Sequence, residues 1–214
     1  MKKDTIKIRL LEERDIQKVV DIHKKTIQSP GSAIGLPYLV KTYRSVCDDS
    51  NLGFGMVAEV YKADSKLIVG GILVTYDVEK FGNIWNMISD PFIVWHLGLG
   101  IVTGRIHLWQ LIQHWKFQCT VRSLYQTPYV SIQALCVAGH MRRLGIGKAL
   151  VTAVIKKAQE KNIPIVYVDT LKTNEAARKF YSSVGFQEHT KAGDSILFIL
   201  PLKTAKGLII DSDR

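Results

Sequence analysis

The alternation of apolar and polar positions predicts a strand at the start of this chain and two helices after it. Residues 6–10 alternate with the two-residue period of a half-buried strand. Asp15 then precedes apolar positions at helical spacing, which predicts a helix capped by Asp15; these positions are Ile16, Val19, Val20 and Ile22. Ser29-Pro30-Gly31 interrupts the pattern, and a second helix is predicted over residues 37–46.

Longer apolar runs predict the remaining strands. Residues 54–61 and 67–76 flank a polar five-residue segment, which predicts a β-hairpin. Gly70 and Gly71 interrupt the second run, so a bulge or a close backbone approach is expected there. Further strands are predicted over residues 129–137, 165–168, 187–190 and 195–200, with a short edge strand at 208–210.

A glycine-containing loop follows the strand at 129–137 and leads into a helical pattern. Its residues are Arg142, Arg143, Leu144, Gly145, Ile146, Gly147 and Lys148. The two glycines lack a Cβ, so the backbone can turn tightly and approach a ligand closely. A helix N-terminus presents unpaired N–H groups and the positive end of the helix dipole, to which the three cations add. The loop therefore suits a pyrophosphate, although an ordinary turn with solvated basic residues explains the spacing equally well.

Two other phosphate-binding motifs are excluded at this loop. A P-loop requires Ser or Thr after the Gly-Lys pair, but Ala149 follows Gly147-Lys148 here. A dinucleotide fingerprint requires a glycine three residues after Gly147, where this chain has Leu150.

A second motif lies downstream and consists of Asn174, Ala177, Tyr181, Gly185 and Phe186. Together with Arg142, Gly145 and Gly147 it resembles the two signatures of the GNAT superfamily of acyl-CoA-dependent N-acyltransferases. The resemblance is strong because both motifs occur in order, separated by one predicted helix and one predicted strand. It implies an α/β (α+β) fold with a mixed, mostly antiparallel central sheet flanked by helices. We expect a single domain over residues 1–214, with the cofactor-binding core at about 129–186.

The resemblance also implies roles for particular residues. Acetyl-CoA is the expected acetyl donor, bound through Arg142, Arg143, Leu144, Gly145, Ile146, Gly147 and Lys148, and through Asn174 and Ala177 beside the pantetheine arm. The backbone of Leu135, Cys136 and Val137 is expected to polarise the thioester oxygen. Tyr181 is expected to protonate the departing thiolate as a general acid. A core aromatic is the alternative interpretation of Tyr181, and a helix N-cap that of Asn174.

The group that removes the proton from the attacking amine is not identified by the sequence. Many members of the family place a carboxylate on the strand at 129–137, but this chain has Gln133 there, which cannot act as a base. Asp169, His140 and Glu59 are alternatives, as is an amine that arrives neutral. Asp21, His23 and Tyr38 are candidate acceptor contacts, although surface helix positions are the favoured interpretation of each.

Residues 77–128 depart from the family pattern, which has a short turn in this place. They contain all four tryptophans, Trp85, Trp95, Trp109 and Trp115. We expect a helical insertion that covers part of the sheet and buries most of these rings. A wall of the acceptor pocket is one alternative, and a surface for a subunit or for lipid is the less favoured one. The longest apolar segment here, 91–102, is shorter than the ~20 residues that span a bilayer.

Composition narrows the class of partner. The chain has 214 residues, 47% of them hydrophobic, and a formal net charge of +10, which favours anionic partners. Its basic residues form no long run or nucleic-acid-binding signature, so we expect a polyanionic cofactor rather than DNA or RNA. Three cysteines, Cys47, Cys119 and Cys136, lie far apart, without metal-ligand spacing and without a disulfide framework. No signal peptide precedes the first strand, so a cytoplasmic location is expected.

The resulting hypothesis is an N-acetyltransferase that moves an acetyl group from acetyl-CoA to a primary amine by direct attack. A small-molecule amine is the first choice of acceptor, because the aromatic insertion could enclose a pocket. A peptide or protein amine is the second. A non-catalytic CoA-binding interaction module is the rival class, and the sequence leaves a homodimer open.

Overall fold

The computed structural model describes residues 6–27, 32, 34–62, 65–81, 91–104, 109 and 128–203. A seven-stranded sheet in the order β1-β2-β3-β4-β5-β7-β6 forms its centre. The strands are β1 (Ile6–Leu10), β2 (Gly53–Lys62), β3 (Ser65–Thr75), β4 (Tyr129–Val137), β5 (Ile165–Leu171), β6 (Gln187–Ala192) and β7 (Ser195–Pro201). Only β4 and β5 pair in parallel, and the other neighbours are antiparallel. The predicted mixed, mostly antiparallel sheet is confirmed.

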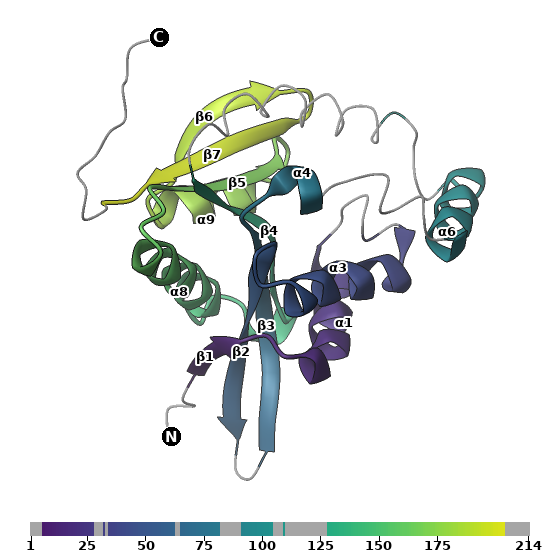
Figure 1. Ribbon diagram of the computed structural model, residues 1–214, viewed down its shortest axis with the longest axis horizontal. Helices are drawn as coiled ribbons and strands as arrows, with labels where there is room; N and C mark the ends of the chain where they lie inside the picture. Colours follow the sequence, from purple (N-terminus) through teal and green to yellow (C-terminus); the bar gives the residue numbers. More distant parts are fainter. Residues whose placement is uncertain are drawn as a thin grey trace.

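Helices cover both faces of this sheet (Figure 1). The helices are α1 (Ile16–Thr26), α3 (Leu36–Asp48), α4 (Val78–Phe81), α6 (Pro91–Val102), α8 (Ile146–Glu160) and α9 (Glu175–Ser183), with short 3-10 turns η1 (Glu13–Asp15) and η2 (Gly139–Met141). Successive side chains of β2 point to opposite faces of the sheet, so the strand contributes to a separate hydrophobic core under each layer of helices. Met56 and Ala58 pack into the core under α8, whereas Val57 packs into the core shared with α1 and α3.

A β-bulge in β4 reverses which side chains face which layer. Leu73 pairs with Ala134 and Val74 pairs with Ile132, so Gln133 has no partner on β3. Ile132 therefore packs under α8, while Ala134 packs against α1 and α3. The bulge lies at the level where β4 stops pairing with β5.

The sequence predicts a bulge or a close backbone approach at Gly70 and Gly71 of β3. The structure has a bulge beside these glycines and a close approach of β4 to Gly70. The register shifts beside Ala58, which pairs with Gly70, while Glu59 pairs with Ile68. A Cβ on Gly70 would stand 2.8 Å from the carbonyl oxygen of Cys136. β3 and β4 can therefore pair at this point only because residue 70 lacks a side chain.

Asp15 begins the first helix as predicted, but it does not cap it. No side-chain cap hydrogen bond is made at Asp15 in α1. Its carboxylate accepts from Arg9 and from the backbone N–H of Glu12. The nearby guanidinium offers charge-assisted hydrogen bonds, which are stronger than those to a backbone N–H.

The insertion lies between β3 and β4, but its longer described helix does not cover the sheet. In Figure 1, α6 lies beside α3 at the edge of the molecule, where Ile93 packs with Ile34. Trp95 is 69% exposed and Trp109 60% exposed, so the prediction of buried tryptophans is wrong for these two. Helix α6 carries no charged residue and is apolar on every side, so contact with α3 leaves its other faces exposed. Trp85, Trp115 and the predicted edge strand at 208–210 lie outside the described residues. Among the described helices, none has the length and hydropathy needed to cross a bilayer.

Candidate active site

β4 and β5 separate partway along their length, and the resulting fork is the centre of the candidate site. The two strands pair only from Tyr129–Ile132 to Ile165–Val168. Beyond that point β4 continues along β3 and β5 continues along β7. Figure 1 shows β5, β7 and β6 running at a steep angle to β2 and β3. Strand edges without a partner offer backbone donors and acceptors to a ligand.

The predicted anion-binding loop connects the end of β4 to α8. Arg143 has φ 65° and Gly145 has φ 80°, so both residues adopt the left-handed conformation. For Arg143 this costs roughly 1–2 kcal/mol, which explains why glycine would turn more easily there. The N–H of Ala149 bonds to the carbonyl oxygen of Gly145 at 2.9 Å. The backbone N–H groups of the residues before Ala149 have no carbonyl oxygen in a preceding helical turn to bond to, because the helix begins there.

The surface of this loop is open and basic. Arg142, Arg143 and Lys148 are exposed, as is Leu144 at 58%, so no packed side chain closes the turn. Ile146 is buried and anchors the loop to the core. The helix dipole and the cations favour an anion at this end of α8.

The end of β4 presents backbone rather than side chains to the fork. Leu135 and Val137 turn their half-buried side chains into the core under α8. The thiol of Cys136 is buried on the opposite face, where Sγ lies 4.0 Å from the carbonyl oxygen of Val19. Burial raises the pKa of the Cys136 thiol to about 12, so the thiol stays protonated at neutral pH. Any role for Cys136 at the fork therefore belongs to its main chain.

Asn174 caps α9, the helix that carries the predicted acid. Its side-chain oxygen accepts from the backbone N–H of Ala177 at 3.1 Å. The N-cap interpretation of Asn174 is thus confirmed, and the cap fixes the start of the helix that places Tyr181.

Tyr181 is 7% exposed and packs among aromatic rings. Its ring centroid lies 5.2 Å from that of Phe180, 5.5 Å from Phe186 and 6.2 Å from Phe198. Burial and then the charge of Asp169 raise the pKa of Tyr181 well above 10. The phenol therefore keeps its proton at neutral pH, as a proton donor must.

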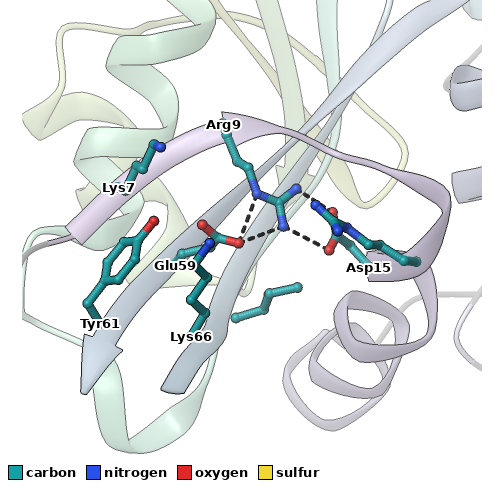
Figure 2. Close-up of a pocket in the computed structure, with 8 residues that line it drawn as sticks. Lys7, Arg9, Asp15, Glu59, Tyr61 and Lys66 are labelled. Carbon is teal, nitrogen blue, oxygen red and sulfur yellow. Dashed lines mark hydrogen bonds and ion pairs between the residues drawn. The ribbon is translucent and has the colours of Figure 1, made fainter. Parts of the chain in front are cut away.

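Two of the three side chains proposed as bases lie away from the fork. Glu59 stands on β2, with β3 and β4 between it and β5. Its carboxylate accepts from Arg9 at 2.6 and 2.8 Å, and Arg9 also bonds Asp15 (Figure 2). The hydrogen bond from Arg9 lowers the pKa of Glu59. His140 is exposed on η2, whereas Asp169 lies on β5 at the fork.

The candidate acceptor contacts on the first two helices are not all surface residues. His23 is 6% exposed, and its Nδ1 lies 3.0 Å from the Tyr43 hydroxyl, inside the contact between α1 and α3. Burial lowers the pKa of His23 to about 4. The surface interpretation of His23 is wrong because this side of α1 faces α3. Asp21 and Tyr38 are half-buried.

The ion-pair network of Arg9, Asp15 and Glu59 is absent from the sequence prediction. Glu59 occupies a buried position of an otherwise apolar strand, and Arg9 occupies a polar position of the alternating strand β1. A buried carboxylate needs a cation beside it. The acidic residue at a buried position of a strand was therefore the feature of the sequence that could have predicted this network.

Comparison with known families identifies the chain. The model of the acetyltransferase (GNAT) family matches residues 35–186, and the chain belongs to this family. Comparison with curated protein sequences gives no match.

Solved structures agree with the fold. One is the ribosomal-protein-S18-alanine N-acetyltransferase from Escherichia coli, with 14% identity, 98% of this chain and 99% of that chain covered, and a TM-score of 0.56. Arabidopsis thaliana NAA60 in complex with a bisubstrate analogue has 16% identity, with 94% of this chain and 100% of that chain covered, and gives a TM-score of 0.61. A chain of the NatC complex bound to Gag peptide and CoA has 20% identity, with 92% of this chain and 99% of that chain covered, and gives a TM-score of 0.56.

Proposed function

We propose that this protein transfers the acetyl group of acetyl-CoA to a primary amine by direct attack. The observation that carries the proposal is the fork between β4 and β5, which opens beside the basic turn at the start of α8. Residues 142–148 would hold the pyrophosphate through N–H groups and cations, and Asn174 and Ala177 would contact the pantetheine arm. The acetyl thioester would then lie in the fork.

The reaction needs a stabiliser for the oxyanion, an acid for the thiolate and an acceptor for the amine proton, and the first two are assigned here to particular residues. The amine nitrogen attacks the thioester carbonyl carbon, a C–N bond forms, and the C–S bond breaks with its electron pair moving to sulfur. Backbone N–H groups of Leu135–Val137 would stabilise the charge that develops on the carbonyl oxygen. Tyr181 would protonate the thiolate, because its hydroxyl is protonated at neutral pH.

The acceptor is proposed as a small-molecule amine, with a peptide or protein amine as the second candidate. The reason for the first is the aromatic content of the insertion that follows β3 in the chain, whose described helix α6 lies beside α3. The second is supported by two structural neighbours, one named as a ribosomal-protein-S18-alanine N-acetyltransferase and the other solved with a bound Gag peptide.

A thiol-release assay with acetyl-CoA tests the proposal. The purified protein is mixed with polyamines, amino sugars, amino-acid derivatives and short peptides, and free CoA is measured over time. We expect amine-dependent CoA release with one acceptor class. Acetyl-CoA binding without release across the whole panel would instead favour the non-catalytic CoA-binding module.

A further inference from the structure

The exposed side of α6 is an interaction surface, and its role does not depend on the proposed reaction. We propose that α6 inserts into the interface of a bilayer that contains anionic lipid, so that the protein binds to membrane surfaces. The sequence makes burial of the insertion the favoured interpretation and a lipid surface the less favoured one. The exposure of α6 reverses that order.

One stripe of α6 packs against the rest of the described chain. Ile93 is buried and packs with Ile34 and Tyr38, and Leu97 is half-buried in the same cluster. Gly100 is buried one turn further along the helix. Positions 93, 97 and 100 are three or four residues apart, so they form one face of the helix, directed towards α3.

The remaining side of α6 is exposed and apolar. Its exposed large side chains are Val94, Trp95, Leu99, Ile101 and Val102, the last of which is 84% exposed. At about 100° per residue, these positions spread over roughly 160° of the helix circumference. A helix that packs one stripe on a core normally carries charged and polar residues on the opposite side. Helix α6 has no charged residue, so its exposed side is poorly suited to water.

The width of the exposed side fits lipid better than a second protein chain. A helix packed on one partner needs an apolar stripe of about 100°, whereas α6 has a wider exposed arc in addition to the stripe on α3. Lipid can surround such an arc at once. With 12 residues, α6 is shorter than the ~20 that span a bilayer, and unburied apolar segments of this length are typical of the interface. Figure 1 shows α6 at the edge of the molecule, where a membrane surface can reach it.

The charge of this part of the sequence matches an anionic surface. Residues 91–127 contain no Asp or Glu, and they include three basic residues, Arg105, Lys116 and Arg122. The whole chain has a formal net charge of +10. Anionic headgroups attract basic residues that adjoin an inserted helix. Tryptophan is enriched at the boundary between headgroups and acyl chains, which suits the exposed ring of Trp95.

Co-sedimentation of the full-length protein with vesicles tests the inference. We expect the wild type to bind vesicles of mixed phosphatidylcholine and phosphatidylglycerol, and to bind phosphatidylcholine alone at least about tenfold more weakly. The double variant Trp95→Gln/Leu99→Gln should bind the mixed vesicles about tenfold or more weakly, because it removes apolar surface from the inserted side. The matched control is Leu10→Gln/Leu67→Gln, which removes two exposed leucines from the sheet and should leave binding unchanged.

A second variant separates insertion from adsorption by charge alone. Trp95→Phe keeps an apolar ring, so its affinity for the mixed vesicles should stay within about threefold of wild type. Lipids with brominated acyl chains quench tryptophan fluorescence on contact. The wild-type fluorescence should therefore fall on binding, and it should fall less in Trp95→Phe. Equal quenching of the two proteins would place Trp95 outside the acyl region and overturn the inference.

Other occupants of the exposed side give different results. If a second copy covers α6, light scattering without lipid will show a wild-type dimer that Trp95→Gln/Leu99→Gln converts to a monomer, and the wild type will not bind vesicles. That result overturns the inference, as does equal vesicle binding by the wild type and the double variant. The proposed function is unaffected by either result, because the thiol-release assay contains no lipid and tests it separately.

Discussion

Gly147 lies so close to Phe180 that a Cβ on the glycine would stand 3.3 Å from two of the ring carbons. Gly147 belongs to the first turn of α8, and Phe180 precedes Tyr181 on α9. The start of α8 and the helix of the proposed acid are therefore in direct contact. A side chain at residue 147 would push the two apart.

Replacing Gly147 with alanine should destabilise the protein. The gain in helix propensity offsets part of the overpacking, and we expect a net fall of about 1 kcal/mol in the free energy of unfolding. Urea denaturation measures this change. Gly139→Ala is the matched control, because nothing lies within 4 Å of the Cβ position at that glycine. Equal stability of the two variants would contradict the close contact.

Arg9 neutralises two buried carboxylates, and its removal should be costly. Asp15 is 4% exposed and Glu59 5% exposed, and both bond the same guanidinium. Arg9→Met leaves these charges without their cation, so the free energy of unfolding should fall by about 3 kcal/mol. Chemical denaturation at neutral pH gives the value.

Arg178 provides the control for Arg9. It forms an ion pair with Glu188 at 2.9 Å in which both side chains are 34% exposed. Arg178→Met should cost less than about 1 kcal/mol, because water screens such pairs. If both arginine variants lose the same stability, the pairing at Arg9 contributes no more than a surface ion pair.

Tyr181→Phe tests whether the protein is an enzyme with a phenolic acid or a CoA-binding module. The variant keeps the aromatic packing and loses only the hydroxyl. We expect kcat to fall by about 100-fold, with acetyl-CoA affinity unchanged, as measured by CoA release and by titration calorimetry. Tyr61→Phe, on β2 beside Arg9, removes a hydroxyl away from the fork and should leave kcat unchanged. Full activity of Tyr181→Phe would exclude the acid role.

His23 should make stability depend on pH between about 6.5 and about 4. Its pKa is lowered from 6.5 to about 4 in the folded protein, so the unfolded chain binds the proton more readily across this window. The free energy of unfolding is therefore highest above pH 6.5 and falls as the pH is lowered, by at most about 3 kcal/mol. The carboxylates of Asp15 and Glu59 add their own loss as the pH falls toward and below their unfolded pKa values of 3.8 and 4.5, because their pKa values are lowered in the folded protein, so the loss from Glu59 overlaps the lower end of this window.

His23→Gln should flatten this part of the stability profile. Glutamine does not titrate and can still accept a hydrogen bond from Tyr43. Denaturation at a series of pH values from 7 to 4 measures the slope. His189→Gln, at an exposed position on β6, should leave the slope unchanged. A wild-type profile that is flat over this window would show that His23 is not held neutral.

Local sequence patterns were sufficient for most of the secondary structure. The strand at Ile6–Leu10 and the helix at Ile146–Glu160 follow from periodicity, which reports the face that each element buries. The N-cap at Asn174 likewise depends on a residue three positions away. These predictions succeeded because each depends on neighbours in the sequence.

Predictions that depended on packing between distant segments failed. Asp15 has the right position for a helix cap, but Arg9 bonds its carboxylate. His23 occupies a helix face that only the position of α3 makes interior. Trp95 is exposed because, within the described part of the chain, α6 packs mainly against α3, which the composition of the insertion does not reveal.

The sequence by itself determined the family, the order of strands and helices, and the residues of the turn between Arg142 and Lys148. Only the tertiary structure decided that β4 and β5 part after Ile132 and Val168, because strand pairing joins segments more than thirty residues apart. The same long-range pairing places the bulge at Gln133, sets Asp169 opposite it, and brings Tyr181 within electrostatic reach of that carboxylate. Periodicity within a segment records which side is buried, but the partner of each edge is chosen by the fold as a whole.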